Sequence, residues 1–189
     1  MTLAPRIRRV ALVAGCMAVP VLALAACVGP FRQHPVGNRH VPEPLKAVDL
    51  TRYLGRWYEI ARYEQSFEKD CEAATATYSL MPDGKISIVN ACRAPDGRER
   101  VAHARAYVLP HTGNAKLKVS FFGPFYIGNY WVMDHAEDYA WAIVGDPSGR
   151  YLWLLDRQAN PSPAEVDALI ARTAALGYDT AMLRRTRQP

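Results

Sequence analysis

Glu59 is the side chain best placed to do chemistry, because it lies in a run of mostly apolar and aromatic residues. The run spans residues 55–62 (GRWYEIAR), and in a strand Glu59 shares one face with Trp57. A buried carboxylate is costly unless it is protonated, hydrated or paired. Three roles stay open for Glu59: a general base, a receptor for a cationic ligand group, or a partner of Tyr and backbone groups that touches no ligand.

Motifs of catalytic, metal and cofactor sites are missing from the sequence. It has no Gly-x-Ser-x-Gly elbow, no glycine-rich phosphate-binding loop and no pair of His at metal-ligand spacing. We therefore expect no catalytic residue, no metal and no cofactor, although residues far apart in the sequence can converge in a fold. The His residues lie in the N-terminal segment or far apart near predicted turns: His34, His40, His103, His111 and His135.

The N-terminus has the pattern of a secretory signal. A basic start precedes an uncharged apolar run over residues 10–26, which is short for a membrane-spanning helix. Residues 24–27 (LAAC) match the site where signal peptidase II cuts before an acylated Cys, which predicts a signal peptide over 1–26 and lipidation of Cys27. Val28, a residue other than Asp, indicates sorting to the outer membrane. An ordinary cleavage after residues 23–25 (ALA), leaving Cys27 as a free thiol, is the alternative.

Loss of the signal peptide changes the charge of the protein. Three Arg and no acid are removed, so the formal net charge falls from +5 to +2 and we expect no nucleic-acid partner. The remaining length suits one domain, predicted over residues 48–189. Residues 28–47, with four Pro among Gly, Asn and His, are predicted to be a flexible tether between Cys27 and that domain.

Alternating apolar and aromatic runs, separated by turn dipeptides such as Asp83-Gly84, predict eight strands. Their short connections favour antiparallel pairing of each strand with the next. Eight strands that close on themselves leave no exposed edge and enclose room for one small ligand. The segment between Tyr63 and Ala73 is expected to be a mobile lid or a partner surface. The predicted ranges are 55–63, 73–81, 85–93, 98–109, 115–122, 129–134, 139–145 and 150–156.

A helix is predicted after the last strand. Ser162 has the position of an N-cap, Glu165 completes a capping box, and Gly177 ends the segment. One apolar stripe recurs at helical spacing, which predicts that the helix packs against the outside of the sheet. Residues 178–183 are predicted to form a short additional strand.

Cys71 and Cys92 are predicted to form a disulfide. They remain after Cys16 is lost with the signal and Cys27 is lipidated, and a pair in an exported protein is most simply a disulfide. The turn over residues 81–84 would bring Cys71 opposite a residue within two positions of Cys92. A reactive thiol or a metal-binding pair is the alternative.

Four stretches carry a resemblance to a known family. Gly55-Arg56-Trp57 resembles the Gly-x-Trp signature of the lipocalins, and residues 76–80, 117–125 and 151–157 resemble the matching segments of bacterial lipocalins, the group that is also similar to apolipoprotein D. The resemblance spans residues 48–186. It implies an all-β fold, an eight-stranded antiparallel up-and-down β-barrel with one C-terminal α-helix packed outside.

The resemblance also assigns roles to residues. Trp57 would fill the barrel floor with Arg157 packed across its ring, and Gly55 would leave room nearby. Alternation then predicts the ligand-binding side chains: Glu59, Ala61, Leu117, Val119, Phe121, Tyr151 and Trp153.

The expected function is that of a lipid carrier in the bacterial cell envelope, anchored to the outer membrane through Cys27. The ligand would be a fatty acid or lysophospholipid, bound for lipid storage, transport or membrane maintenance. A lipid-modifying enzyme that uses Glu59 as general base is one alternative, and a haem or other tetrapyrrole carrier, with a Cys or His inside the barrel, is another. The sequence allows a homodimer and does not decide the oligomeric state.

Overall fold

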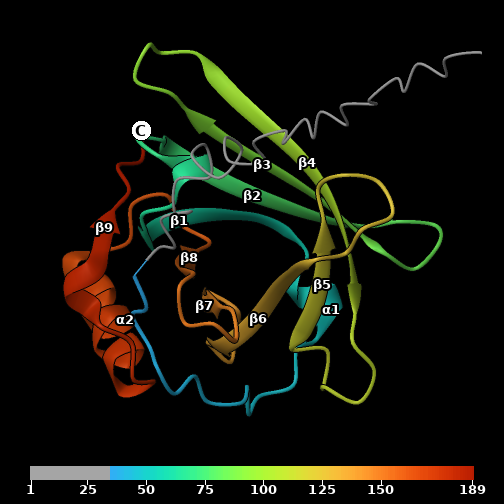
Figure 1. The fold of residues 1–189 in the computed structure, drawn as a ribbon. Helices are drawn as coiled ribbons and strands as arrows, with labels where there is room; N and C mark the ends of the chain where they lie inside the picture. Colours follow the sequence, from blue (N-terminus) through green and yellow to red (C-terminus); the bar gives the residue numbers. More distant parts are fainter. Residues whose placement is uncertain (1–34) are drawn as a thin grey trace, which may run out of the picture. The chain divides into compact units, whose positions relative to one another are not determined.

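An antiparallel sheet curls around a central axis in the computed structural model, which describes residues 35–189 (Figure 1). The predicted signal peptide and Cys27 lie outside the described residues. The strands of the described part are β1 (Gly55–Tyr63), β2 (Glu72–Leu80), β3 (Ile86–Arg93), β4 (Glu99–Val108), β5 (Lys116–Ser120), β6 (Gly128–His135), β7 (Trp141–Gly145), β8 (Leu152–Asp156) and β9 (Leu183–Arg185).

Strand β1 closes the barrel, because it pairs antiparallel with β2 on one side and with β8 on the other. Each of the strands from β2 to β8 pairs with its neighbour in the sequence. The predicted eight-stranded up-and-down barrel is therefore confirmed. Strand β9 pairs with residues 61–63 of β1, a part that β2 does not reach, and it begins where the predicted additional strand ends.

Alternation along the strands separates two apolar layers. One layer fills the barrel and includes Trp57, Leu117 and Val119. The other lies between the sheet and a helix and includes Leu154 and Leu169. Strands that contribute to both layers, such as β8, are buried on both sides, which explains why they are apolar on both faces.

The C-terminal helix α2 (Pro163–Ala175) lies outside the barrel, as predicted (Figure 1). The hydroxyl of Ser162 accepts a hydrogen bond from the backbone N–H of Glu165, and the Glu165 carboxylate accepts one from the backbone N–H of Ser162. Gly177 follows the helix with φ of 86°, a conformation that glycine adopts without strain. Within residues 35–189, no helix has the length and apolar character that a membrane crossing requires.

Three short helical turns complete the elements of the described part. Helix α1 (Leu50–Tyr53) precedes β1 and has its first turn capped by the carboxylate of Asp49. The 3₁₀ turn η1 (Ser66–Glu68) lies in the connection from β1 to β2, and η2 (Thr180–Met182) leads into β9.

The predicted flexible tether over residues 28–47 is wrong at its C-terminal end. The backbone N–H groups of Gly37 and Asn38 donate to the carbonyl of Gly149, and Asn38 Nδ2 donates to the carbonyl of Leu176 at 3.0 Å. Lys46 Nζ lies 3.1 Å from the carboxylate of Asp134. Residues 37–47 therefore belong to the folded domain, because buried polar partners hold a segment whose composition resembles that of a linker.

Candidate functional site

The barrel is sealed at the end where β1 begins. Trp57 is fully buried, and its indole N–H donates to the carbonyl of Tyr53 at 2.8 Å. The guanidinium carbon of Arg157 lies 3.7 Å from the centre of the Trp57 ring. Gly55, at φ of 96°, leaves room for Arg157 beside it. Arg157 also donates to the backbone carbonyls of Arg52, Tyr53, Leu54 and Arg56.

The contact predicted between Trp57 and Arg157 is thus present. Arg157 binds the C-terminal end of helix α1 as well as the Trp57 ring, because three of its four carbonyl acceptors belong to residues 52–54. Burial lowers the pKa of Arg157, and the nearby Tyr53 opposes that shift. The guanidinium therefore connects the end of β8 to the short helix α1, which covers the barrel floor.

A cluster of tyrosines fills the space directly above the floor. The hydroxyl of Tyr130 shares hydrogen bonds with the hydroxyls of Tyr53 at 2.7 Å and Tyr78 at 2.9 Å. A cavity of about 10 Å³ remains there, lined in part by Leu117, which is room for about one water molecule. Burial raises the pKa of all three tyrosines. Little room for a ligand therefore remains at this level of the barrel.

Three of the predicted ligand-binding residues line the interior. Leu117 and Val119 are buried in the interior layer, and Trp153 packs against it while partly buried. Tyr151 precedes β8 at the open end, and its ring stacks on that of Trp153 with centroids 6.0 Å apart. The shared face predicted for Tyr151 and Trp153 is therefore present.

Phe121 does not belong to the barrel wall. Strand β5 ends at Ser120, and Phe121 lies in the following loop with 47% of its surface exposed. The sequence continues with Phe122, Gly123 and Pro124, so the apolar run extends beyond the strand that it predicts. Pairing with β6 begins at Val119, which is why the alternation stops there.

Ala61 points away from the interior, contrary to the prediction. In the pairing of β1 with β8, Glu59 lies opposite Leu155 and Ala61 lies opposite Leu154, so Ile60 is an extra residue. This β-bulge reverses the alternation of β1. Ala61 is consequently packed in the outer layer under helix α2.

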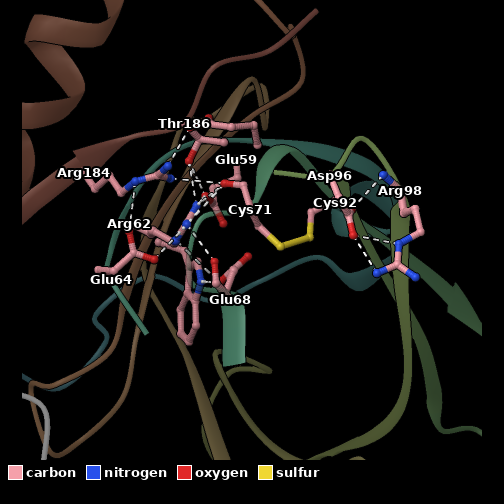
Figure 2. Close-up of a disulfide and its surroundings, with 12 residues drawn as sticks. Glu59, Arg62, Glu64, Glu68, Cys71, Cys92, Asp96, Arg98, Arg184 and Thr186 are labelled. Atoms are coloured by element: carbon pink, nitrogen blue, oxygen red, sulfur yellow. Dashed lines mark hydrogen bonds and ion pairs between the residues drawn. A yellow bond between two sulfur atoms is a disulfide. The ribbon is translucent and has the colours of Figure 1, made fainter. Parts of the chain in front are cut away.

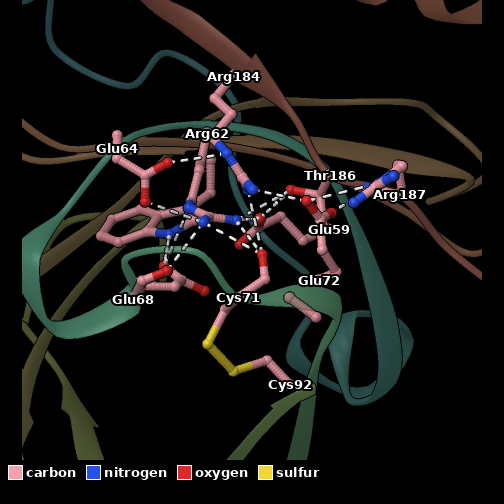
Figure 3. A network of polar contacts seen from close by, with 12 residues as sticks. Glu59, Arg62, Glu64, Glu68, Cys71, Glu72, Cys92, Arg184, Thr186 and Arg187 are labelled. Carbon is pink, nitrogen blue, oxygen red and sulfur yellow. Dashed lines mark hydrogen bonds and ion pairs between the residues drawn. A yellow bond between two sulfur atoms is a disulfide. The ribbon is translucent and has the colours of Figure 1, made fainter. Parts of the chain in front are cut away.

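The same bulge turns Arg62 toward the interior face, where it lies opposite Trp153 in the neighbouring strand. Arg62 Nη1 donates to the Glu59 carboxylate at 2.6 Å and to the Thr186 hydroxyl at 3.1 Å (Figure 3). The Thr186 hydroxyl also donates to Glu59. Glu59 is therefore buried and paired. Arg62 is absent from the predicted site, because ideal alternation puts it on the other face of β1.

Glu68 is a second carboxylic acid at this place and is also absent from the predicted site. Its Oε2 accepts a hydrogen bond from the indole N–H of Trp153 at 3.1 Å and lies 4.0 Å from Arg62 Nε. Burial and the neighbouring Glu59 raise the pKa of Glu68 to about 8, and the contacts with Trp153 and Arg62 act in the opposite direction. Glu68 ends the short 3₁₀ turn η1, where no strand periodicity indicates which way a side chain points.

Cys71 and Cys92 form the predicted disulfide, which joins the connection after β1 to the end of β3 (Figure 2). The carbonyl of Cys71 also accepts hydrogen bonds from Arg62 and Arg184. The carbonyl of Glu68 accepts another from Arg62 at 2.8 Å. The segment predicted as a mobile lid is thus held over the polar cluster by several contacts.

Comparisons with known proteins agree with this geometry. The lipocalin-like domain family matches residues 48–188. The chain is a lipocalin. This lipocalin is 39% identical to the outer membrane lipoprotein Blc of Vibrio cholerae, an alignment that covers 74% of this chain and 84% of the relative. It is 40% identical to the Blc lipoprotein of Escherichia coli K12, with 75% and 80% covered.

More distant proteins share the family or the fold. Apolipoprotein D of Rattus norvegicus is 32% identical to this lipocalin over 81% of this chain and 86% of the relative. Insecticyanin of Manduca sexta is similar in structure, with a TM-score of 0.64, 21% identity, and 82% and 90% of the two chains covered. The bacterial relatives confirm the predicted class, because both carry the name outer membrane lipoprotein.

Proposed function

We propose that this lipocalin binds the acyl chain of a fatty acid or lysophospholipid inside its barrel. The observation that carries the proposal is a closed barrel with a sealed floor and an apolar wall that includes Leu117, Val119 and Trp153. Burying acyl methylenes contributes about 0.8 kcal/mol each before ordering costs. Non-covalent binding alone would therefore hold a lipid.

The proposed role in the envelope is lipid storage, transport or membrane maintenance. Acylation of Cys27 would attach the protein to the bilayer, since more than one acyl chain gives stable anchoring without a membrane-spanning helix. The relatives from Vibrio cholerae and Escherichia coli carry the name outer membrane lipoprotein, which supports this arrangement. A homodimer stays a prediction.

Native mass spectrometry of the mature protein tests the proposal. We expect fatty acids or lysophospholipids to co-purify with the wild type, and a Val119→Trp variant, which fills the interior, to lose them. Val101→Trp is the matched control, because Val101 lies on β4 with 49% of its surface exposed. A folded protein without bound lipid that also fails to take up palmitate would refute the proposal.

Two other functions fit the contacts of the described residues less well. A lipid-modifying enzyme would need Glu59 as a general base, but the Glu59 carboxylate already accepts hydrogen bonds from Arg62 and Thr186. Product release from a bound lipid would reveal such an activity. A haem or tetrapyrrole carrier would need a Cys or His ligand, but both nitrogens of the buried His135 contact backbone carbonyls, and Cys71 and Cys92 are joined to each other. An absorption spectrum tests this function directly.

A further inference from the structure

Two N–H groups converge on one carboxylate oxygen near the open end of the barrel. Trp153 Nε1 donates to Glu68 Oε2 at 3.1 Å. Arg62 Nε lies 4.0 Å from the same oxygen, which is too far for a hydrogen bond. Arg62 Nε has no other hydrogen-bond partner, although the Arg62 side chain is fully buried. A buried donor without an acceptor is costly, so this place favours a further acceptor.

The position of these groups fits the end of an acyl ligand. Because the tyrosine cluster fills the barrel near its floor, we expect the acyl chain along the wall beside Trp153. The Glu68 side chain is 18% exposed and belongs to the connection that covers this end. The head group of a chain packed against Trp153 would therefore meet Glu68 and Arg62.

We propose that Arg62 Nε, Trp153 Nε1 and the carboxyl group of Glu68 form the binding site for the anionic head group of an acyl ligand, a carboxylate or a phosphodiester. This inference rests on the proposed lipid-binding function and names its ligand class. The ligand oxygen takes the place of Glu68 Oε2 between the two N–H donors. Glu59 is a positioning residue, because its ion pair holds the Arg62 guanidinium in place.

The charges around the site decide when an anion is accepted. Arg62, Arg184 and Arg187 pair with the three carboxylates of Glu59, Glu64 and Glu72, and these six charges cancel. The state of Glu68 therefore sets the sign of the site: neutral Glu68 leaves it uncharged, whereas ionised Glu68 makes it negative.

The pKa of Glu68, raised to about 8 by burial and by Glu59, puts this change close to neutral pH. Tyr78 faces Glu68 from β2, but burial raises its pKa too and keeps it neutral over the same range. The pKa of Arg62 is also raised above its ordinary value; burial opposes this shift, and Glu59 more than offsets that effect. Glu68 is thus the group whose ionisation repels an anionic ligand as the pH rises through about 8.

Titration of the mature protein with four lipids of one chain length tests the inference. The probes are laurate, lauroyl lysophosphatidylglycerol, uncharged monolauroylglycerol and cationic dodecyltrimethylammonium, each at about pH 6.5 and about pH 9.5. We expect the affinity for the anions to fall at least about tenfold at the higher pH. The affinity for monolauroylglycerol should stay the same, and that for the cation should rise.

Variants connect the pH effect to named atoms. Glu68→Gln should bind laurate equally well at both pH values, whereas the control Glu64→Gln, which alters another partner of Arg62, should keep the wild-type pH dependence. Trp153→Phe removes one N–H donor and should weaken the binding of the anions more than that of monolauroylglycerol. Circular dichroism verifies that each variant is folded.

The outcomes separate this inference from the function on which it rests. Binding of monolauroylglycerol together with pH-independent binding of both anions would overturn the head-group site and leave lipid binding intact. No binding of any of the lipids would overturn both. A pH effect on laurate alone identifies a carboxylate as the head group, and one on the lysophospholipid alone identifies a phosphodiester.

Discussion

The guanidinium of Arg62 forms an ion pair with Glu59 at 2.6 Å, and both side chains are almost completely shielded from water. The two side chains can contact each other because Ile60 is an extra residue in β1. Without this bulge, alternation would put Glu59 and Arg62 on opposite faces of the strand. A buried pair of this kind costs much to break, because removing one partner leaves the other charge unpaired.

Arg62→Met should therefore destabilise the protein by about 3–5 kcal/mol in urea unfolding. The double variant Glu59→Gln with Arg62→Met should be more stable than Arg62→Met alone, since it also removes the unpaired carboxylate. A double variant that shows the sum of the two single effects would contradict the coupling between these residues.

Arg157→Ala should lower the free energy of unfolding by about 2–3 kcal/mol, because it removes the contact with Trp57 and several charged hydrogen bonds. Arg98→Ala is the control. The Arg98 side chain is 84% exposed, and the change should stay within about 0.5 kcal/mol. Lipid stoichiometry should be unchanged in Arg157→Ala, and unchanged melting with lost binding would show that Arg157 serves the ligand instead of the floor.

Glu68 should make stability depend on pH. Its ordinary pKa is near 4.5 in the unfolded chain, and the fold raises it to about 8. The folded protein therefore holds a proton that the unfolded chain releases, and the contribution of Glu68 to stability, complete below pH 4.5, decreases as the pH rises to about 8. Between pH 5 and pH 8, the free energy of unfolding of Glu68→Gln should decrease by at least about 1 kcal/mol less than that of the wild type. Unfolding curves with parallel pH profiles for the two proteins would contradict the raised pKa.

Gly149→Ala should be much more harmful than Gly84→Ala, although both glycines have positive φ. A Cβ at Gly149 would overlap the backbone of Asn38, whereas a Cβ at Gly84 meets no atom within 4 Å. We expect a loss of about 1 kcal/mol for Gly84→Ala and at least about 2 kcal/mol for Gly149→Ala. Equal losses in thermal unfolding would mean that residues 37–47 are a free tether after all.

Replacing both Cys71 and Cys92 by Ala should cost about 3 kcal/mol, the chain-entropy value for a loop closed across 21 residues. The loss should exceed that of Glu68→Gln at low pH, because the disulfide holds the whole connection after β1. Urea unfolding with and without a reducing agent measures it. A reducing agent should affect the wild type and leave the double variant unchanged.

Local sequence signals predicted most elements of the barrel. Alternation and turn dipeptides predicted the strands, and the capping box of Ser162 and Glu165 predicted the start of helix α2, because each signal acts within a few residues. The floor contact of Trp57 and Arg157 came from the family resemblance and is present in the structure. For Phe121 the apolar pattern was misleading, because the length of β5 depends on its neighbour β6.

The sequence by itself determined the class of this protein: a lipocalin barrel with a disulfide and a capped outer helix. Only the tertiary structure decided which side chains reach the interior near the open end. Because of the bulge at Ile60, Arg62 faces the interior in place of Ala61. The connection after β1, which the disulfide joins to β3, places Glu68 beside Trp153. Faces in a strand follow from local alternation, whereas a bulge and a folded-back loop follow from pairing with segments far away in the chain.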